Sequence, residues 1–302
     1  LNKKRLDAIV KESCVGLEAV DPEIIINDVV NNLFDGVPKA DVSQALVMSA
    51  RTLVEQDPNY SYVAARLLLD LLRSEALQFM GVAEYASFED MKDYYPKAFK
   101  AYIHKAIELE LLDPILATEY DLNALGAALL PERDNQFTYL SIQTLYDRYL
   151  IHSHGSRFEL PQIFFMRVAM GLCINEPDKT SRVIEFYQQL SSFDYMSSTP
   201  TLFNSGTLRS QLSSCYLTTI SDDLYGIYSS MRDNALLSKF AGGLGNDWTN
   251  VRSMGAHIKG TNGVSQGVIP FLKVANDTAV AVNQGGKRKG AICAYLENWH
   301  LD

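Results

Sequence analysis

Residues 214–218 read Ser-Cys-Tyr-Leu-Thr, and we expect this short run of aromatic, aliphatic and hydroxyl side chains to form a β-strand. Helical and strand-like segments then alternate to the end of the chain: a helix at about residues 222–240, a strand at 246–251, a helix at about 270–283 and a strand at 291–296. Strands that alternate with helices are typical of an α/β layer or barrel. Since only three strands are visible, we expect this architecture to continue beyond Asp302.

The chain before residue 194 reads as mainly helical. Its apolar residues recur at helical spacing, and polar or proline residues stand where helices should begin, at Asp21, Ser87, Pro96, Asp121 and Pro161. From residue 194 onward, Gly, Ser, Thr and Asn become frequent. We therefore divide the sequence into a helical module at 1–78, a second helical segment at 79–193 and an α/β segment at 194–302. The expected fold class is α/β with a mainly helical N-terminal part.

The composition is that of an ordinary globular protein. Hydrophobic residues make up 47% and charged residues 21% of the 302 positions, and 27 basic against 36 acidic residues leave a net charge of -9. A nonspecific nucleic-acid binder needs a basic surface, so the charge balance argues against that class. No apolar run reaches the roughly 18–20 residues of a membrane span, and no signal peptide follows Leu1. We therefore expect no membrane contact, a cytoplasmic location and a natural N-terminus upstream of Leu1.

The four cysteines form no recognisable metal or disulfide motif. Cys14, Cys173, Cys215 and Cys293 include no CxxC pair, and the histidines do not join them at zinc-ligand spacing, so we expect no bound metal. Isolated cysteines in such a chain are commonly buried apolar residues. Cys215 stands at the start of a predicted strand after two small polar residues, where a thiol could exchange electrons with a second thiol. That second thiol would have to be close in space, in this chain or outside it.

Polar and glycine-rich stretches lie on either side of the first predicted strand. Residues 197–207 offer six hydroxyl groups, which suit a phosphate or a sugar, although a surface turn explains the composition equally well. Residues 240–245 contain three glycines after a helix. Such glycines let a backbone approach a ligand closely, or they simply end the helix. They are not a dinucleotide fingerprint, because the last glycine of GxGxxG is absent and the helix precedes them.

Two glycine-rich basic loops lie in the same segment, at residues 257–263 and 283–290. The second carries three consecutive cations, which can meet phosphate. Gly285 and Gly290 have the glycine spacing of a P-loop, but the next two residues are Ala and Ile where that motif needs Lys and then Ser or Thr. A solvated loop is the plain alternative. Two such loops in one α/β region point toward a nucleotide phosphate.

In their order and spacing, these segments resemble the large, catalytic subunits of the ribonucleotide reductase family. The resemblance rests on short motifs within about residues 195–302: Ser198-Thr199-Pro200-Thr201 with Asn204-Ser205-Gly206, Ser213-Ser214-Cys215, Arg252 with Gly255, Gln284-Gly285-Gly286-Lys287-Arg288, and Trp299-His300-Leu301. Nearer the N-terminus, Asp35-Gly36 and Tyr62-Val63-Ala64-Ala65-Arg66-Leu67 look like the later part of the family's ATP-cone.

The resemblance implies a fold and a reaction. Residues 1–78 would be an ATP-cone-like module without its opening hairpin, 79–193 the helical segment of the catalytic subunit, and 194–302 the start of a ten-stranded α/β barrel. The family reduces ribonucleotides to deoxyribonucleotides. A thiyl radical takes the 3′ hydrogen of the ribose, and a pair of thiols then reduces the 2′ position and becomes a disulfide. By resemblance, Cys215 is one thiol of that pair.

The resemblance also assigns binding residues. The substrate would be contacted by Thr199, Ser214, Gly242 and Gly243. An allosteric specificity site would be formed by Asp222, Asp223, Leu224, Arg252, Ile258 and Lys259. A mobile loop between effector and substrate would consist of Gln284, Gly285, Gly286, Lys287 and Arg288. An effector that shifts this loop would change which base the active site accepts.

The implied ligands are nucleotides. A ribonucleoside diphosphate would be the substrate, and ATP, dATP, dTTP and dGTP would be effectors, with Mg²⁺ accompanying the nucleotide and no other cofactor on this chain. The implied partners are the C-terminal part of the catalytic subunit, a radical-generating metal-containing small subunit, thioredoxin or glutaredoxin as reductant, and further copies of the chain.

The sequence also departs from the family pattern. The family's radical cysteine and the second thiol of the pair lie C-terminal to the Trp-His-Leu segment, beyond Asp302, so this chain alone would not be a complete reductase. Lys39 stands where a Thr is common and Ser74 where a Lys is common, which argues against control of activity by ATP and dATP. Three alternatives stay open: a nucleotide-binding regulatory fragment without turnover, an adenosylcobalamin-dependent reductase of the same family, and a helical scaffold without ligands.

Overall fold

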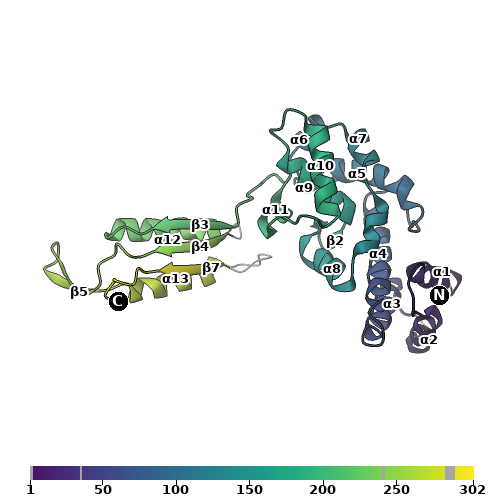
Figure 1. Cartoon of the computed structure of the whole chain (residues 1–302), viewed down its shortest axis with the longest axis horizontal. Coiled ribbons are helices and arrows are strands. Elements are labelled where there is room, and N and C mark those ends of the chain that lie inside the picture. The colour runs from purple at the N-terminus through teal and green to yellow at the C-terminus, as the bar shows by residue number, and fades with distance from the viewer. Residues whose placement is uncertain (1–2, 35, 240–241, 283–289) are drawn as a thin grey trace. The chain divides into compact units, whose positions relative to one another are not determined.

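The computed structural model describes residues 3–34, 36–239, 242–282 and 290–302, and the chain forms two compact units (Figure 1). The first unit consists of residues 1–197 and 202–210, and the second of 198–201 and 211–302. This division lies close to residue 194, where the change in composition predicts the start of the α/β segment. Within the described ranges, no helix has both the length and the apolar character that a membrane crossing requires.

The first unit opens with helices α1 (Lys3–Cys14), α2 (Pro22–Asn32), α3 (Lys39–Thr52) and α4 (Tyr60–Phe79). The predicted start of α2 is confirmed, since the Asp21 carboxylate accepts a hydrogen bond from the Glu23 N–H at 2.9 Å. Arg66 on α4 donates to the carbonyls of Ser13 and Val15 at 3.1 and 2.7 Å. These bonds satisfy carbonyl groups at the end of α1 and tie that helix to α4.

The first unit continues with further helices and turns, and the sequence predicts where several of them begin. They are α5 (Met91–Glu108), α6 (Ile115–Thr118), α7 (Leu122–Ala127), a 3₁₀ turn (Pro131–Gln136), α8 (Tyr139–Thr144), a π turn (Leu145–Tyr149), α9 (Pro161–Leu172) and α10 (Lys179–Ser191). The predicted starts at Asp121 and Pro161 are confirmed: Asp121 caps α7, and Pro161 is the first residue of α9.

The predicted helix start at Pro96 is wrong, because Pro96 lies inside α5. The turn before this helix is built by Ser87, whose backbone N–H and hydroxyl both donate to the Asp90 carboxylate, at 2.9 and 2.7 Å. Pro96 is the sixth residue of α5, and its ring nitrogen cannot donate to the Lys92 carbonyl. The predicted start at Ser87 thus precedes α5, which begins at Met91, by one turn, and the one at Pro96 lies inside the helix.

One continuous apolar core runs through the first unit, from Leu6 on α1 to Leu202. Residues 1–78 and 79–193 accordingly pack in the same compact unit, and their separate assignment as an ATP-cone-like module and a helical segment stays a prediction. A short antiparallel hairpin of β1 (His152–Ser153) and β2 (Ser156–Arg157), which the helical reading does not predict, lies between α8 and α9 in sequence.

A fully buried ion pair crosses this core. The Arg167 Nε atom on α9 lies 2.7 Å from the Glu159 Oε1 atom, and neither side chain has any exposed surface. The same guanidinium donates to the carbonyls of Ser205 at 2.7 Å and Leu202 at 3.1 Å. Tyr102 also donates to the Glu159 carboxylate. Arg167 therefore holds residues 202–205 against α9 while its charge is neutralised by Glu159.

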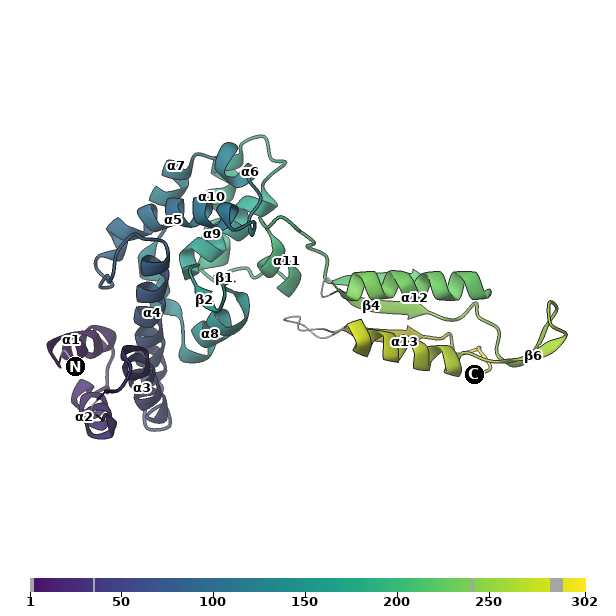
Figure 2. The same ribbon diagram turned by 180° about the vertical axis from the view of Figure 1, so that it is seen from behind.

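The second unit is built on a parallel sheet with the strand order β3, β4, β7. The strands are β3 (Cys215–Thr219), β4 (Gly243–Asp247) and β7 (Ala291–Tyr295). Helix α12 (Leu224–Ser238) connects β3 to β4, and α13 (Ile269–Val282) precedes β7. The two helices run along the sheet next to each other (Figures 1 and 2). This arrangement confirms the predicted α/β class for the C-terminal segment.

Three local predictions after residue 194 need correction. The strand expected at 246–251 lies at Gly243–Asp247, because the glycines expected to end a helix pair with strands on both sides. The stretch 197–207, expected as a loop, contains helix α11 (Thr199–Asn204). The basic loop at 257–263 forms the turn of an antiparallel hairpin of β5 (Met254–Ile258) and β6 (Gly263–Gln266), with His257, Ile258 and Gly263 in the strands.

Candidate functional site

The sheet of the second unit has one covered and one open face. Leu244 and Asn246 point to the covered face, where they are buried on the side of α12 and α13. Alternate residues of a strand point to opposite faces, and the register places Cys215, Leu217 and Cys293 together on the other face. All three are exposed there. The open face of the sheet can therefore receive a ligand, and it carries two thiols.

The predicted substrate residues gather at the N-terminal edge of the sheet. Cys215 begins β3, and the Gly243 N–H donates to the Ser214 carbonyl at 2.8 Å. The Ser214 hydroxyl donates to the Cys215 Sγ atom at 3.8 Å. At Gly242 a Cβ atom would lie 2.6 Å from the Tyr216 ring, so glycine is needed for this close approach. The structure thus brings Ser214, Cys215, Gly242 and Gly243 together.

Thr199 belongs to the same neighbourhood. It is the half-buried first residue of α11, and the hydroxyl of Thr201, two residues later, donates to the Leu212 carbonyl at 3.2 Å. Residue 212 lies on the segment that leads directly into β3. This bond holds the start of α11 beside the entry to the strand, so the hydroxyl-rich stretch and the Cys215 thiol belong to one candidate site.

Cys293 shares the open face with Cys215, but it is too far away to be its disulfide partner. The two residues lie on outer strands of the sheet, and Cys293 is in register with Leu217 rather than with Cys215. Ordinary strand spacing and rise put their Cα atoms about 12 Å apart, whereas a disulfide needs at most about 7 Å. Cys14 and Cys173 lie in the first unit, where burial raises the pKa of each thiol to about 11. Such thiols are suited to packing rather than to electron transfer.

Tyr295 is a residue of the open face that sequence reasoning missed. A hydrogen bond to Cys293 is the main cause that raises the pKa of the Tyr295 hydroxyl, and the Cys215 thiol acts in the same direction. The phenol therefore stays protonated at neutral pH, as a hydrogen-bond donor beside the thiols. The sequence did contain a signal for this residue: Tyr295 stands two residues after Cys293 on a predicted strand, which places both side chains on the same face of the sheet.

The predicted specificity-site residues lie at the opposite, C-terminal edge of the sheet. Asp222 follows β3 and Arg252 follows β4, and the Arg252 Nε atom lies 3.0 and 2.9 Å from the two carboxylate oxygens of Asp222. The Arg252 backbone N–H also donates to Asp222 at 3.1 Å, and its guanidinium donates to the His257 carbonyl on β5 at 3.2 Å. The structure thus joins the turn after β3, the turn after β4 and the hairpin.

The remaining members of the predicted effector group have different environments. The Asp223 carboxylate caps α12 by accepting from the Gly226 N–H at 2.8 Å, and this bond lowers its pKa. Asp223 therefore has a structural role whatever it binds. Leu224 is exposed at the start of α12, Ile258 is half-buried at the end of β5, and Lys259 is exposed in the turn that follows.

The two candidate groups are separated by the length of the strands. A five-residue strand places Cys215 about 13 Å from the C-terminal edge, where the effector group lies. Helix α13 starts near that edge and ends near the thiol edge, since Gly290 directly precedes the pairing of Ala291 with Gly243. The predicted relay residues, Gln284, Gly285, Gly286, Lys287 and Arg288, lie outside the described residues.

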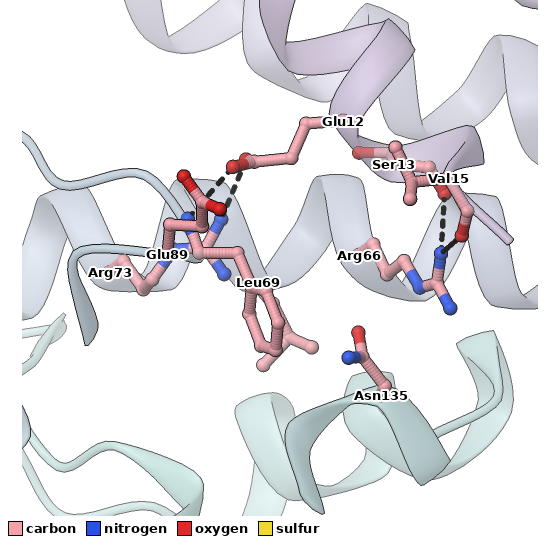
Figure 3. Close-up of a pocket in the computed structure, with 9 residues that line it drawn as sticks. Glu12, Ser13, Val15, Arg66, Leu69, Arg73, Glu89 and Asn135 are labelled. Carbon is pink, nitrogen blue, oxygen red and sulfur yellow. Dashed lines mark hydrogen bonds and ion pairs between the residues drawn. The ribbon is translucent and has the colours of Figure 1, made fainter. Parts of the chain in front are cut away.

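A separate cavity of about 330 Å³ lies in the helical unit (Figure 3). It is lined by Glu12, Ser13, Val15, Arg66, Leu69, Arg73, Phe88, Glu89 and Asn135. Arg73 pairs with Glu12 at 3.8 Å and with Asp70 at 3.5 Å, so its charge is already compensated. We assign no ligand to this cavity. Among the described residues, no three His, Cys, Asp or Glu side chains are grouped as a metal site would require.

Comparison with known proteins identifies relatives over nearly the whole chain. Residues 135–210 match the ribonucleotide reductase all-alpha domain, and residues 213–302 match the ribonucleotide reductase barrel domain. The chain is 54% identical over 285 residues to the ribonucleoside-diphosphate reductase subunit alpha of Chlamydia trachomatis, covering 94% of this chain and 27% of that protein. It is 40% identical over 305 residues to the Helicobacter pylori subunit alpha, covering 100% of this chain and 37% of the relative.

A eukaryotic relative matches over a similar range. The ribonucleoside-diphosphate reductase large chain of Schizosaccharomyces pombe is 35% identical over 303 residues, which are 99% of this chain and 36% of that protein. The chain therefore spans between about a quarter and two fifths of the length of these relatives. The boundary between the two matched domains, at residues 210 and 213, falls where the structure divides into its two units.

Proposed function

This chain belongs to the ribonucleotide reductase large-subunit family, and we propose that it forms the N-terminal part of a catalytic subunit that reduces ribonucleoside diphosphates. The observation that carries the proposal is the exposed Cys215 thiol on the open face of the sheet, beside Ser214 and Gly243. A thiol packed inside the core could not reach a substrate, and this one is accessible.

In the proposed reaction Cys215 supplies one of two reducing thiols. A thiyl radical elsewhere in the subunit takes the ribose 3′ hydrogen and later returns it. The two thiols supply two protons and two electrons as they form a disulfide: one proton goes to the 2′ hydroxyl, which leaves as water, and the other proton and both electrons go to C2′. Cys293, about 12 Å from Cys215, is too far away to be the second thiol. Following the family resemblance, we place the second thiol and the radical cysteine in the part of the subunit that follows Asp302.

We propose that Thr199, Ser214, Gly242 and Gly243 bind the substrate at the thiol edge. The hydroxyls of Thr199 and Ser214 can donate to phosphate or ribose oxygens, and glycine at position 242 lets the backbone lie against the Tyr216 ring at the same edge. Their convergence on the same edge as Cys215 supports this assignment. The reduced thiols would be restored by thioredoxin or glutaredoxin, and the radical would come from a metal-containing small subunit.

At the other edge we propose an effector site for dATP, ATP, dTTP or dGTP with Mg²⁺. Its residues would be Asp222, Asp223, Leu224, Arg252, Ile258 and Lys259. The Arg252 guanidinium and the Lys259 ammonium offer positive charge for phosphates, and Asp222 has acceptor oxygens for a ribose hydroxyl. The contact of Arg252 with both Asp222 and the hairpin supports a single site at this edge.

We also propose that copies of the chain pair through α12 and α13. Tyr225, Tyr228 and Leu236 are 82%, 52% and 56% exposed on α12, and Val280 is 70% exposed on α13. A single copy keeps its effector edge and its thiol edge apart. Two copies with these helices antiparallel would bring the effector edge of one copy toward the thiol edge of the other.

The proposal predicts that turnover depends on residues outside this chain. Residues 1–302 alone, supplied with a dithiol and the small subunit, should produce no deoxynucleotide, because the radical cysteine and the second thiol are missing. The intact subunit should produce it under the same conditions, measured by chromatography of the nucleosides. Product from residues 1–302 alone would refute our placement of the two missing cysteines, and no product from the intact subunit would refute the proposed activity.

A second prediction concerns Asp222. Replacement by Ala removes both the acceptor for the ribose hydroxyl and the partner of Arg252, so effector affinity should fall by roughly 10- to 100-fold, as expected for lost bonds between charged groups. Calorimetric titration of the intact subunit with dTTP would measure it. Asp93→Ala, at an exposed position of α5 in the helical unit, is the matched control and should bind normally. An Asp222→Ala variant with wild-type affinity would show that the effector binds elsewhere.

A further inference from the structure

We propose that Asp302 and His300, which follow β7, are positioning residues that hold both ends of the β5–β6 hairpin and so determine how well the effector site discriminates between effectors. The inference rests on the proposed function in one respect, namely that this hairpin carries Ile258 and Lys259 of the effector site. Its structural part, the fixation of the hairpin, stands on contacts within the second unit.

The Asp302 carboxylate bridges the two ends of the hairpin. Its Oδ1 atom accepts from the Met254 N–H at 2.8 Å, and its Oδ2 atom accepts from the Val268 N–H at 2.7 Å. Met254 is the first residue of β5, and Val268, which is fully buried, lies between β6 and α13. These two bonds lower the pKa of Asp302, so the carboxylate is charged and the bonds are of the stronger, charge-assisted kind.

Gly267 lies directly against the Asp302 carboxylate, at a position where no side chain would fit. Its φ angle is +78°, which other residues adopt only with strain. A Cβ atom at this position would lie 2.2 Å from the Asp302 Oδ2 atom and 2.9 Å from the Met254 backbone nitrogen. Any side chain at position 267 would therefore displace the Asp302 carboxylate. The local backbone and the Asp302 side chain are therefore fitted to each other.

His300 holds the same segment from the other side. Its Nδ1 atom accepts from the Asp302 N–H at 3.1 Å, and its Nε2 atom lies 2.7 Å from the Val251 carbonyl. Since Nδ1 acts as the acceptor, Nε2 carries the proton and donates to that carbonyl. Val251 directly precedes Arg252, which pairs with Asp222. The residues after β7 thus connect to both the hairpin and the Asp222–Arg252 pair.

These contacts keep the hairpin ordered before an effector arrives. A two-stranded hairpin on its own is only marginally stable in water, and Met254 and Val264 on it are 69% and 61% exposed. If its ends were released, an effector would have to order the hairpin on binding and would lose affinity by that cost. The contacts of Ile258 with the bases of different effectors would also become less distinct, so the affinities for these effectors would become more alike.

The test compares Asp302→Asn with wild type in the intact catalytic subunit. Asparagine has nearly the same shape, but it accepts at only one oxygen and would present an NH₂ group to the second backbone N–H. We expect amide hydrogen exchange to become at least about tenfold faster at residues 254–268 without nucleotide, and the affinities for dTTP and dGTP to fall about tenfold and become more alike. His300→Phe, which removes two neutral bonds, should give the same pattern more weakly.

Glu185→Gln is the matched control, because Glu185 is an exposed carboxylate on α10 whose charge partner is Arg182 on the same helix. It should leave hairpin exchange and effector affinity unchanged. Unaltered exchange at 254–268 in both Asp302→Asn and His300→Phe would overturn the inference, and so would faster exchange with wild-type affinities. A wild-type subunit that binds neither dTTP nor dGTP would instead refute the proposed effector site, while the exchange measurement would still decide whether the residues hold the hairpin.

Discussion

Cys215→Ser should abolish deoxynucleotide formation by the intact subunit with a dithiol reductant, a loss of about three orders of magnitude or more. A serine hydroxyl has nearly the size of the thiol, but it cannot be oxidised to a disulfide, so the two electrons for C2′ are no longer available. Because Cys215 is exposed on the open face and supports no core packing, the variant should fold normally. Turnover at saturating substrate, with circular dichroism as the folding check, measures the effect.

Cys293→Ser is the matched control for this experiment. Cys293 is equally exposed on the same face, but it lies about 12 Å from Cys215 by strand spacing and cannot take part in the same disulfide. It should retain most of its turnover, and both variants should bind effector at the distant edge with unchanged affinity. Wild-type turnover in Cys215→Ser would show that Cys215 takes no part in the reaction. Equal losses of turnover in both variants would show that the reaction depends on the intact open face rather than on the Cys215 thiol alone.

Much of the helical unit could be predicted because its signals are local. Asp21 and Asp121 cap helices with their own side chains, and Pro161 begins one, so each start depends on a few neighbouring residues. The prediction at Pro96 was wrong because a proline is commonly the first residue of a helix, whereas this one is the sixth residue of α5. The short hairpin at residues 152–157 has too few residues to produce a periodic pattern.

The central strand of the sheet was harder to predict. Gly243–Asp247 contains two glycines and two polar residues, and glycine is unfavourable in strands by propensity. The strand forms because β3 and β7 pair with it on both sides and because Leu244 and Asn246 are buried by tertiary packing. These partners are distant in sequence. The pattern therefore indicated the alternation of strands and helices but misplaced this strand by several residues.

The candidate site, too, could be predicted only in part: the sequence indicated its residues but not their arrangement. The family motifs indicated Cys215, Ser214 and Arg252, and the structure groups them at two edges of one sheet. The separation of these edges depends on strand length and register, which the motifs do not contain. Likewise, the contacts of Asp302 with Met254 and Val268 join residues more than thirty positions apart, so no local pattern could reveal them.

Arg167→Ala should destabilise the helical unit by about 3–5 kcal/mol, because it leaves the Glu159 carboxylate buried without its counter-charge. The variant also leaves the carbonyls of Leu202 and Ser205 without their donor. For a unit of this size the midpoint of thermal unfolding should fall by roughly 10 °C. Far-UV circular dichroism follows this unit, since most of the helices belong to it, while fluorescence reports the other unit, which contains Trp248 and Trp299.

Two comparisons separate the buried charge from the lost hydrogen bonds. Arg182→Ala breaks an exposed ion pair with Glu185 and should leave the unfolding midpoint unchanged, since such pairs contribute little. In the double variant Glu159→Leu with Arg167→Met, no charge is left unpaired, so stability should recover in part. It should not recover fully, because residues 202–205 still lack the guanidinium that holds them against α9. An Arg167→Ala variant as stable as wild type would show that water reaches Glu159 and that the ion pair is not buried in solution.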